Sequence, residues 1–330
     1  MHRCTCSCPL VCLQARLPHP MRIVFMGTPD FAVPSLRALL DAGYRPVAVV
    51  TVPDRPAGRG QRMQPSAVKE AAEAAGLPVF QPASLRDEGF QAELAALEPD
   101  VIVVVAFRIL PPEVYGLARR GAFNLHASLL PAFRGAAPIN RALMAGVAET
   151  GVTTFFLRPQ VDTGAVILQR RVPVGPDETA GELHDRLAEV GAEAVVETVR
   201  RIERGEAEAV PQDDALASPA PKLFKEDMAV DWAQPARRVH DHVRALSPYP
   251  AAWTTLPDGS QVKLYRTAVV DEHGHRGAPG AVIEAGERVV VACGEGAVEI
   301  LELQREGKRR MSARDFLNGY PLAVGARLGV

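Results

Sequence analysis

The sequence has few aromatic residues, almost no net charge and no long apolar run. Aromatic residues make up 5% of the 330 positions, which argues against a surface built mainly for stacking nucleic-acid bases. The formal net charge is -2 at pH 7, so no overall basic field points to nucleic acid. No uninterrupted apolar run approaches the ~20 residues of a membrane span, and we therefore expect no membrane partner.

Cysteine is scarce outside the first twelve residues. Four of the five cysteines lie at positions 4, 6, 8 and 12, and the fifth is Cys293. Their C-x-C-x-C spacing lacks the separated second ligand pair of a zinc site, so we expect no metal. Residues 1–20 also lack the apolar core of a signal peptide, and Met21 opens a strand-like run. We therefore expect residues 1–20 to lie outside the folded domains, and the one remaining cysteine suits the reducing cytoplasm.

β-branched apolar runs alternate with helix-like segments from residue 21 to residue 205. The continuous run Val101–Ala106 is typical of a central parallel strand covered on both faces. This alternation predicts a Rossmann-like α/β domain with a parallel sheet over residues 21–205. The expected strands are 23–26, 47–52, 79–80, 101–106, 122–125 and 151–157, and the expected helices are 33–42, 67–75, 90–97 and 179–204.

The pattern changes after Gly205. Residues 206–226 are rich in Ala, Pro, Asp and Glu without a clear period, which indicates a linker. Residues 227–330 then predict one helix and a series of short strands separated by turns such as Asp258-Gly259. This spacing favours a small, OB-like β-barrel as a second domain. The expected helix is 233–246, and the expected strands are 252–256, 261–270, 281–283, 289–292 and 298–304.

The turn after the first expected strand is not a dinucleotide-binding turn. Gly27-Thr-Pro-Asp-Phe31 contains one glycine, and Pro29 removes a backbone donor. A pyrophosphate site needs several closely approaching glycines and a free helix amino end, so we expect neither NAD nor FAD. The loop still lies at the carboxyl edge of the sheet, where ligands of α/β proteins bind.

Asn124 and His126 are the strongest candidates for catalysis. They stand two residues apart at the end of an expected strand, so their side chains project from the same face. Asparagine can donate to a developing oxyanion, and histidine can donate or move a proton. Asp162, in the turn after strand 151–157, is expected at the same sheet edge, although a turn of this kind is by itself mostly structural. Together the three residues predict a proton-transfer site.

Two loops are candidates for binding. Ser128-Leu-Leu-Pro131 leaves the expected strand after His126, and its apolar leucine pair is suited to line a ligand pocket. The loop Val52–Met63 holds Arg55, Arg59 and Arg62 among glycines. It is either a solvated loop or an arm that grips a large anionic substrate, because arginine binds phosphate in a bidentate way.

These segments together resemble the methionyl-tRNA formyltransferase family, over nearly the whole chain from Met21. The chain departs from the family pattern at Ala106–Pro111, which is one residue shorter and has no glycine, and at Gln160, where glycine is usual. The matching motifs, in order, are Gly27-Thr-Pro-Asp-Phe31, Pro53-Asp-Arg-Pro-Ala-Gly-Arg-Gly60, Asn124-Leu-His126, Ser128-Leu-Leu-Pro131, Arg134-Gly-Ala-Ala-Pro-Ile139, Asp162-Thr-Gly164, Ser247-Pro-Tyr-Pro-Ala-Ala-Trp253 and Gly307-Lys-Arg-Arg-Met311.

The resemblance implies transfer of a formyl group from 10-formyltetrahydrofolate to the α-amino group of methionyl-tRNA (initiator tRNA), which leaves tetrahydrofolate. We expect the enzyme to work in the cytoplasm as a monomer. The catalytic trio of the family falls on Asn124, His126 and Asp162. The segments expected to hold the folate comprise Ser128, Leu129, Leu130, Pro131, Phe107, Arg108, Ile109 and Leu110.

Any basic surface for tRNA must be local, because residues 227–330 contain as many acidic as basic residues. For each candidate, the alternative is a solvated surface charge that touches no phosphate. The candidates are Arg55, Arg59 and Arg62 in the arginine loop, Lys222 and Lys225 in the linker, and Lys263, Lys308, Arg309 and Arg310 in the second domain.

Two other functions remain open at this point. A formyltransferase that acts on a sugar or another small amine would share the Asn–His–Asp trio but would not need the arginine loop or a tRNA-binding barrel. A non-catalytic folate- or tRNA-binding module is the other, and the intact trio argues against it.

Overall fold

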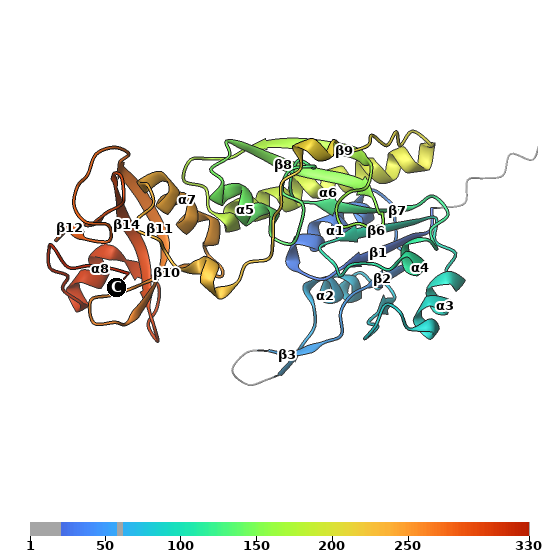
Figure 1. Ribbon diagram of the computed structural model, residues 1–330. Coiled ribbons are helices and arrows are strands. Elements are labelled where there is room, and N and C mark those ends of the chain that lie inside the picture. The colour runs from blue at the N-terminus through green and yellow to red at the C-terminus, as the bar shows by residue number, and fades with distance from the viewer. Residues whose placement is uncertain (1–20, 58–61, 330) are drawn as a thin grey trace, which may run out of the picture.

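The computed structural model describes residues 21–57 and 62–329, which form two lobes side by side (Figure 1). The first lobe contains a seven-stranded sheet between helices, and the second contains a six-stranded antiparallel sheet with helices packed against it. Residues 1–20, which we expected to lie outside the folded domains, fall outside the described residues, and so does Arg59.

The first five strands of the large sheet are parallel, as the β-branched runs predicted. Both β1 and β6 are completely buried, because helices cover both faces of the sheet. The predicted Rossmann-like α/β domain is confirmed. In spatial order the parallel strands are β5 (Val79–Phe80), β2 (Ala48–Val50), β1 (Ile23–Gly27), β6 (Val101–Val105) and β7 (Ala122–His126).

The helices divide between the two faces of this sheet. Their buried side chains form two separate clusters, one on each side. On one face lie α1 (Val33–Asp41), α2 (Ala67–Ala74) and α6 (Ala180–Arg204), and on the other lie α3 (Glu88–Ala96) and α4 (Pro112–Tyr115). The long α6 begins with a capping box between Thr179 and Glu182 and ends at Gly205, whose left-handed backbone stops the helix.

The last two strands of the sheet are antiparallel to their neighbours, a detail that the predicted parallel-sheet fold did not include. β8 (Glu149–Phe156) is antiparallel to β7, and β9 (Val166–Pro173), which we did not predict, is antiparallel to β8. A short loop suffices to join β8 and β9, whereas a parallel strand would need a crossover segment. The carboxyl end of β8 therefore lies beside the amino end of β7, because Phe156 pairs with Phe123.

The second lobe is the small, barrel-like unit that the short strands predicted. Its strands follow the order β10 (Ala252–Thr255), β11 (Gln261–Asp271), β14 (Ala297–Arg305), β13 (Val289–Ala292) and β12 (Val282–Ala285), and β15 (Met311–Ser312) pairs with β14. Residues 326–329 connect the two edges, since Ala326 and Leu328 bond to Val282 and Gly280 while Gly329 donates to Thr255. Helices α7 (Ala236–Leu246) and α8 (Ala313–Gly319) pack against this core, and α8 was not predicted.

The segment expected as a long polar loop contains a hairpin. Its strands β3 (Arg55–Ala57) and β4 (Arg62–Gln64) project from the first lobe (Figure 1). The base of the hairpin is anchored through Asp54, whose carboxylate accepts from Lys69 Nζ and from the Gln81 amide, both at 2.7 Å. The hairpin is thus tied to α2 and to the segment after β5.

A buried polar joint connects the lobes. Arg244 of α7, which is 5% exposed, donates from Nε to Asp241 at 2.7 Å. The same guanidinium donates to the carbonyls of Gly175 and Glu178 in the first lobe, both at 3.1 Å. His240, one turn earlier in α7, contacts the carbonyl of Pro176 through Nε2 at 3.1 Å. The segment before α6 is therefore held by two side chains of α7.

Acid is expected to weaken this protein through the histidines of α7. Burial lowers the pKa of both His240 and His242 below the ordinary 6.5, so the folded state keeps them neutral. Unfolding returns them to ordinary values, so the unfolded chain binds more protons once the pH falls to about 6.5. The free energy of unfolding should fall between pH 7.5 and pH 5.5 when it is measured with urea.

His240→Gln should make that fall shallower, because glutamine can donate to Pro176 but does not titrate. His273→Gln is the matched control, since the His273 side chain is 85% exposed. Equal pH dependence in His240→Gln and in the parent protein would contradict the assignment.

Candidate active site

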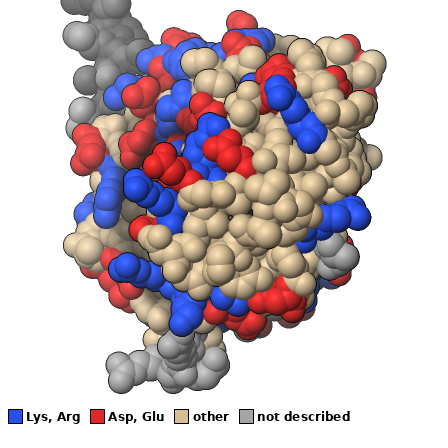
Figure 2. All heavy atoms as spheres, turned by 90° about the vertical axis from the view of Figure 1, so that its left-hand side faces the viewer, with Lys and Arg blue, Asp and Glu red and all other residues tan. Residues whose placement is uncertain are grey.

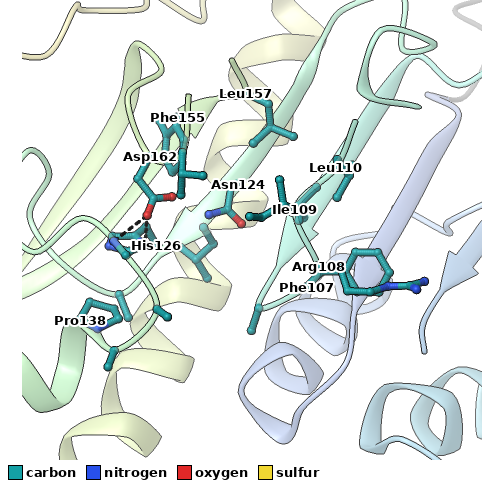
Figure 3. Close-up of a pocket in the computed structure, with 18 of the residues that line it drawn as sticks. Phe107, Arg108, Ile109, Leu110, Asn124, His126, Pro138, Phe155, Leu157 and Asp162 are labelled. Carbon is teal, nitrogen blue, oxygen red and sulfur yellow. Dashed lines mark hydrogen bonds and ion pairs between the residues drawn. The ribbon is translucent and has the colours of Figure 1, made fainter. Parts of the chain in front are cut away.

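A cavity of about 600 Å³ lies on one face of the large sheet, next to β6 and β7 (Figure 3). Its walls come from the loop after β6, the segment that leads into α5 (Pro138–Met144), and the loop between β8 and β9. Asn124, His126 and Asp162 all line it, so the structure brings the three predicted residues together. Asn124 and His126 share one face of β7, as their spacing predicted.

Both ring nitrogens of His126 face acceptor oxygens, but only Nε2 lies within hydrogen-bond distance. Nε2 lies 2.9 Å from the carbonyl oxygen of Phe133, which can only accept, so Nε2 carries a proton. Nδ1 lies 3.7 Å from Oδ2 of Asp162, and both side chains are at most 10% exposed. A second proton on the ring would therefore sit on Nδ1, facing the carboxylate of Asp162.

Asp162 reaches His126 by a route that the sequence did not suggest. We expected it at the carboxyl edge shared by β7, but β8 runs antiparallel and ends at the opposite edge. The loop after β8 instead folds back along the sheet face, and Asp162 adopts a left-handed backbone with φ of 56°. Oδ2 accepts from the backbone N–H of Gly135 at 2.9 Å, which fixes the carboxylate beside His126.

Gln212, from the predicted linker, also holds the Asp162 loop. Its side-chain amide donates to the carbonyls of Asp162 and Gly164 at 2.9 and 2.8 Å. Its oxygen accepts two bonds from Arg134. Sequence reasoning missed this residue, because a single glutamine in an irregular segment gives no signal. The linker is therefore part of the site's scaffold as well as a connection.

The Asn124 side chain points into the cavity with its amide available for a ligand (Figure 3). Within the part of the chain that the structure describes, this amide has no hydrogen-bond partner. The same holds for Oδ1 of Asp162, since only Oδ2 is engaged. The cavity thus presents a neutral donor, an imidazole ring and a free carboxylate oxygen around one space, which suits acyl transfer to an amine.

The two predicted folate segments differ in their relation to this cavity. Phe107, Arg108, Ile109 and Leu110 line it, whereas the Ser128–Pro131 segment does not. Ser128 is completely buried and donates to the Ala132 carbonyl at 2.6 Å. The segment is further fixed by Thr153, which donates to the Ser128 carbonyl, and by Gln169, which donates to the Leu130 carbonyl. The leucine pair Leu129 and Leu130 thus belongs to a loop that the sheet holds in place, and its contact with the folate stays a prediction.

Known proteins are similar to this chain in sequence and in fold. The formyl transferase family model matches residues 21–199, and the model of the formyl transferase C-terminal domain matches residues 222–321. A methionyl-tRNA formyltransferase of Moorella thermoacetica is 50% identical over 311 residues, which cover 94% of this chain and 99% of that protein. One of Chlorobium luteolum is 52% identical over 305 residues, covering 91% and 97%. The chain belongs to the methionyl-tRNA formyltransferase family.

More distant proteins of known structure have the same fold. An N-formyltransferase from Helicobacter canadensis, in complex with folinic acid and dTDP-3-aminofucose, is 18% identical with a TM-score of 0.66, covering 86% of this chain and 99% of that one. HypX from Aquifex aeolicus, in complex with tetrahydrofolic acid, is 22% identical with a TM-score of 0.62, covering 93% and 48%. At these identities the likeness concerns the fold alone.

The basic residues that the sequence offered as tRNA contacts are spread over the surface, and those with described side chains are exposed. No ion pair forms at Arg55, Lys222, Lys225, Lys263, Lys308 or Arg309 among the described residues. Arg310 differs, because it pairs with Glu302 and stacks on Tyr265. Arg59 and the side chain of Arg62 are not among the parts of the chain that the structure describes.

The exposed end of the second lobe has no continuous basic face. Figure 2 shows acidic and basic side chains interspersed around uncharged surface there. This agrees with the equal numbers of acidic and basic residues in the sequence. Any attraction for RNA must therefore come from local groups of cations, as the composition indicated.

Proposed function

We propose that this protein transfers a formyl group from 10-formyltetrahydrofolate to the α-amino group of methionyl-tRNA, with Asn124, His126 and Asp162 as the catalytic residues. The observation that carries the proposal is their convergence in one cavity of a chain that belongs to this family. A metal is not needed for this chemistry, and no cluster of metal-ligating side chains occurs among the described residues.

The transfer begins when the neutral amine attacks the formyl carbon, which turns the carbonyl oxygen into an oxyanion. The Asn124 amide is free to donate to that oxygen, and an imidazolium at His126 adds positive charge nearby. The nitrogen–carbon bond to the folate then breaks, and the folate nitrogen takes up a proton. Oδ1 of Asp162 is placed to order a water that carries this proton from the amine.

The cavity fits the folate co-substrate. Its volume of about 600 Å³ is that of a typical small-molecule site, and its walls are mostly apolar. Leu110, Phe155 and Leu157 line the cavity together with Asn124, and their apolar side chains can enclose a flat heterocycle (Figure 3). We infer that Phe107–Leu110 form one wall of the folate subsite.

Incubating the purified protein with 10-formyltetrahydrofolate and charged initiator tRNA should yield formyl-methionine. Formylation of a small amine with none on tRNA would overturn the proposal in favour of a sugar-type enzyme. Folate binding without formylation of any amine would favour a binding module. The curated relatives at about half identity support the tRNA reaction over both alternatives.

The setting of the reaction belongs to the same proposal. We expect the protein to act as a monomer in the cytoplasm, with the hairpin arginines and the cations of the second lobe on the tRNA. Among the described residues, no helix is both long and apolar enough to cross a membrane.

A further inference from the structure

Phe133 and Asp162 both adopt a left-handed backbone, with φ of 61° and 56°. Residues other than glycine rarely adopt this conformation, so contacts from the surrounding structure must hold each of them in it. Both backbones bear on the catalytic pair, because Asp162 belongs to it and the Phe133 carbonyl contacts Nε2 of His126 at 2.9 Å. The geometry of that pair therefore depends on what holds these two residues.

Ser218 holds Phe133 from the segment that joins α6 to the second lobe. Its Oγ accepts from the Phe133 N–H at 2.9 Å. Its backbone contacts the neighbours of Phe133, since its N–H donates to Pro131 at 3.3 Å and its carbonyl accepts from Arg134 at 2.8 Å. The N–H and the carbonyl of Phe133 are linked through only two backbone dihedrals. The serine hydroxyl therefore helps to fix the direction in which that carbonyl meets His126.

Gln212, earlier in the same segment, holds the turn of Asp162. Its Nε2 donates to the carbonyls of Asp162 and Gly164 at 2.9 and 2.8 Å. Its Oε1 accepts from Nε and Nη2 of Arg134 at 3.0 and 2.7 Å, and a guanidinium can only donate. The amide is therefore held in one orientation, with its donor end facing the two carbonyls of the turn.

The segment also lies against the loop that carries Gly135, whose N–H donates to Oδ2 of Asp162 at 2.9 Å. Ala220 is completely buried, and its N–H donates to the Arg134 carbonyl at 2.6 Å. A Cβ at Gly135 would lie 2.4 Å from the carbonyl oxygen of Ala220, so this close approach requires glycine. A shift of the segment would therefore displace the loop that fixes the carboxylate.

We propose that Ser218 and Gln212 are positioning residues for formyl transfer. Ser218 acts through Phe133 on His126. Gln212 acts on the turn that carries Asp162. This role rests on the proposed function, and neither side chain lines the cavity that the structure describes. Nδ1 of His126 and Oδ2 of Asp162 lie 3.7 Å apart, beyond hydrogen-bond distance, so a small displacement of either residue changes how the pair interacts (Figure 3).

Steady-state and single-turnover formylation of methionyl-tRNA measure this role. Gln212→Glu keeps an acceptor for Arg134 but cannot donate to the two carbonyls, so it should lower kcat about 10–10²-fold, as a misplaced catalytic group does. Ser218→Ala should lower kcat about tenfold, and Ser218→Thr, which keeps the accepting hydroxyl, should restore most of it. The KM values for both substrates should stay within about twofold, because neither residue touches a substrate.

Asp214→Ala is the matched control. Asp214 lies in the same segment and bonds the same Arg134 guanidinium at 2.8 Å, but its side chain is 83% exposed. This variant should keep the parent kcat, and a loss as large as that in Gln212→Glu would overturn the proposal. A lower midpoint of urea unfolding in Ser218→Ala and Gln212→Glu, with kcat unchanged, would show that the two residues only join the lobes.

A double variant tests whether Gln212 acts through Asp162. Adding Gln212→Glu to Asp162→Ala should lower kcat no further, because the carboxylate that Gln212 positions is already gone. If the two losses multiplied instead, Gln212 would act on the reaction independently of Asp162, against the proposal.

The His126 ring signals in nuclear magnetic resonance give a readout that needs no turnover. In protein with isotope-labelled histidine, these signals are identified by their loss in His126→Gln. Ser218→Ala should shift them, because the Phe133 carbonyl that faces Nε2 moves, whereas Asp214→Ala should leave them in place. Unshifted signals in Ser218→Ala would overturn its role. A parent protein that formylates no tRNA would contradict the proposed function, and the ring signals would still decide whether Ser218 positions His126.

Discussion

Replacing Asn124 with alanine is expected to lower kcat for formyl transfer by about 10²–10³-fold, which is typical for the loss of one oxyanion donor. We expect a loss of kcat of this size because the Asn124 amide faces the cavity without a hydrogen-bond partner among the described residues. No contact that stabilises the fold is lost with it. The affinity for tetrahydrofolate, measured by titration, should stay within about twofold. Single-turnover formylation of methionyl-tRNA would report the loss directly.

Asn124→Asp is the matched control for this prediction. It keeps the shape of the side chain but replaces the donor with a group that repels an oxyanion, so its kcat should be no higher than that of the alanine variant. If either variant kept more than about a tenth of the parent kcat, or lost folate affinity in proportion to kcat, Asn124 would not be the oxyanion donor.

The sequence predicted most of the fold where local pattern and burial agree. Helices cover both faces of the sheet, so β1 and β6 are completely buried. In the sequence these strands are therefore continuous apolar runs, rich in β-branched residues. β9 was missed because it is an edge strand whose centre, Gln169 to Arg171, is polar and partly exposed. α5 was missed as well, since it has only seven residues and begins at Pro138.

In the candidate site, too, features set by neighbouring residues were predictable, whereas features set by long-range contacts were not. The spacing of Asn124 and His126 fixes their common face through strand geometry alone. The position of Asp162 depends on the direction of β8, on Gln212 from a distant segment and on the backbone of Gly135, none of which appears in a local pattern. The place of Leu129 and Leu130 is not fixed by local pattern either, since an apolar pair in a loop fits a buried support as well as a pocket wall.

The joint between the lobes leads to the largest expected change in stability. Asp241 is 2% exposed and Arg244 is 5% exposed, and the two form an ion pair at 2.7 Å. Asp241→Ala should lower the free energy of unfolding by about 3–5 kcal/mol, because it leaves a buried guanidinium without its counter-charge. Urea unfolding at neutral pH measures the change through the shift of the midpoint.

The double variant Asp241→Leu with Arg244→Met shows how much of the lost free energy of unfolding comes from the unpaired charge and how much from the loss of the ion pair itself. Because both charges are removed together, its free energy of unfolding should lie well above that of Asp241→Ala, close to that of the parent protein. It nevertheless loses the two bonds from Arg244 to Gly175 and Glu178, which join α7 to the segment before α6. A double variant as unstable as Asp241→Ala would show that those two bonds, rather than charge compensation, hold the lobes together.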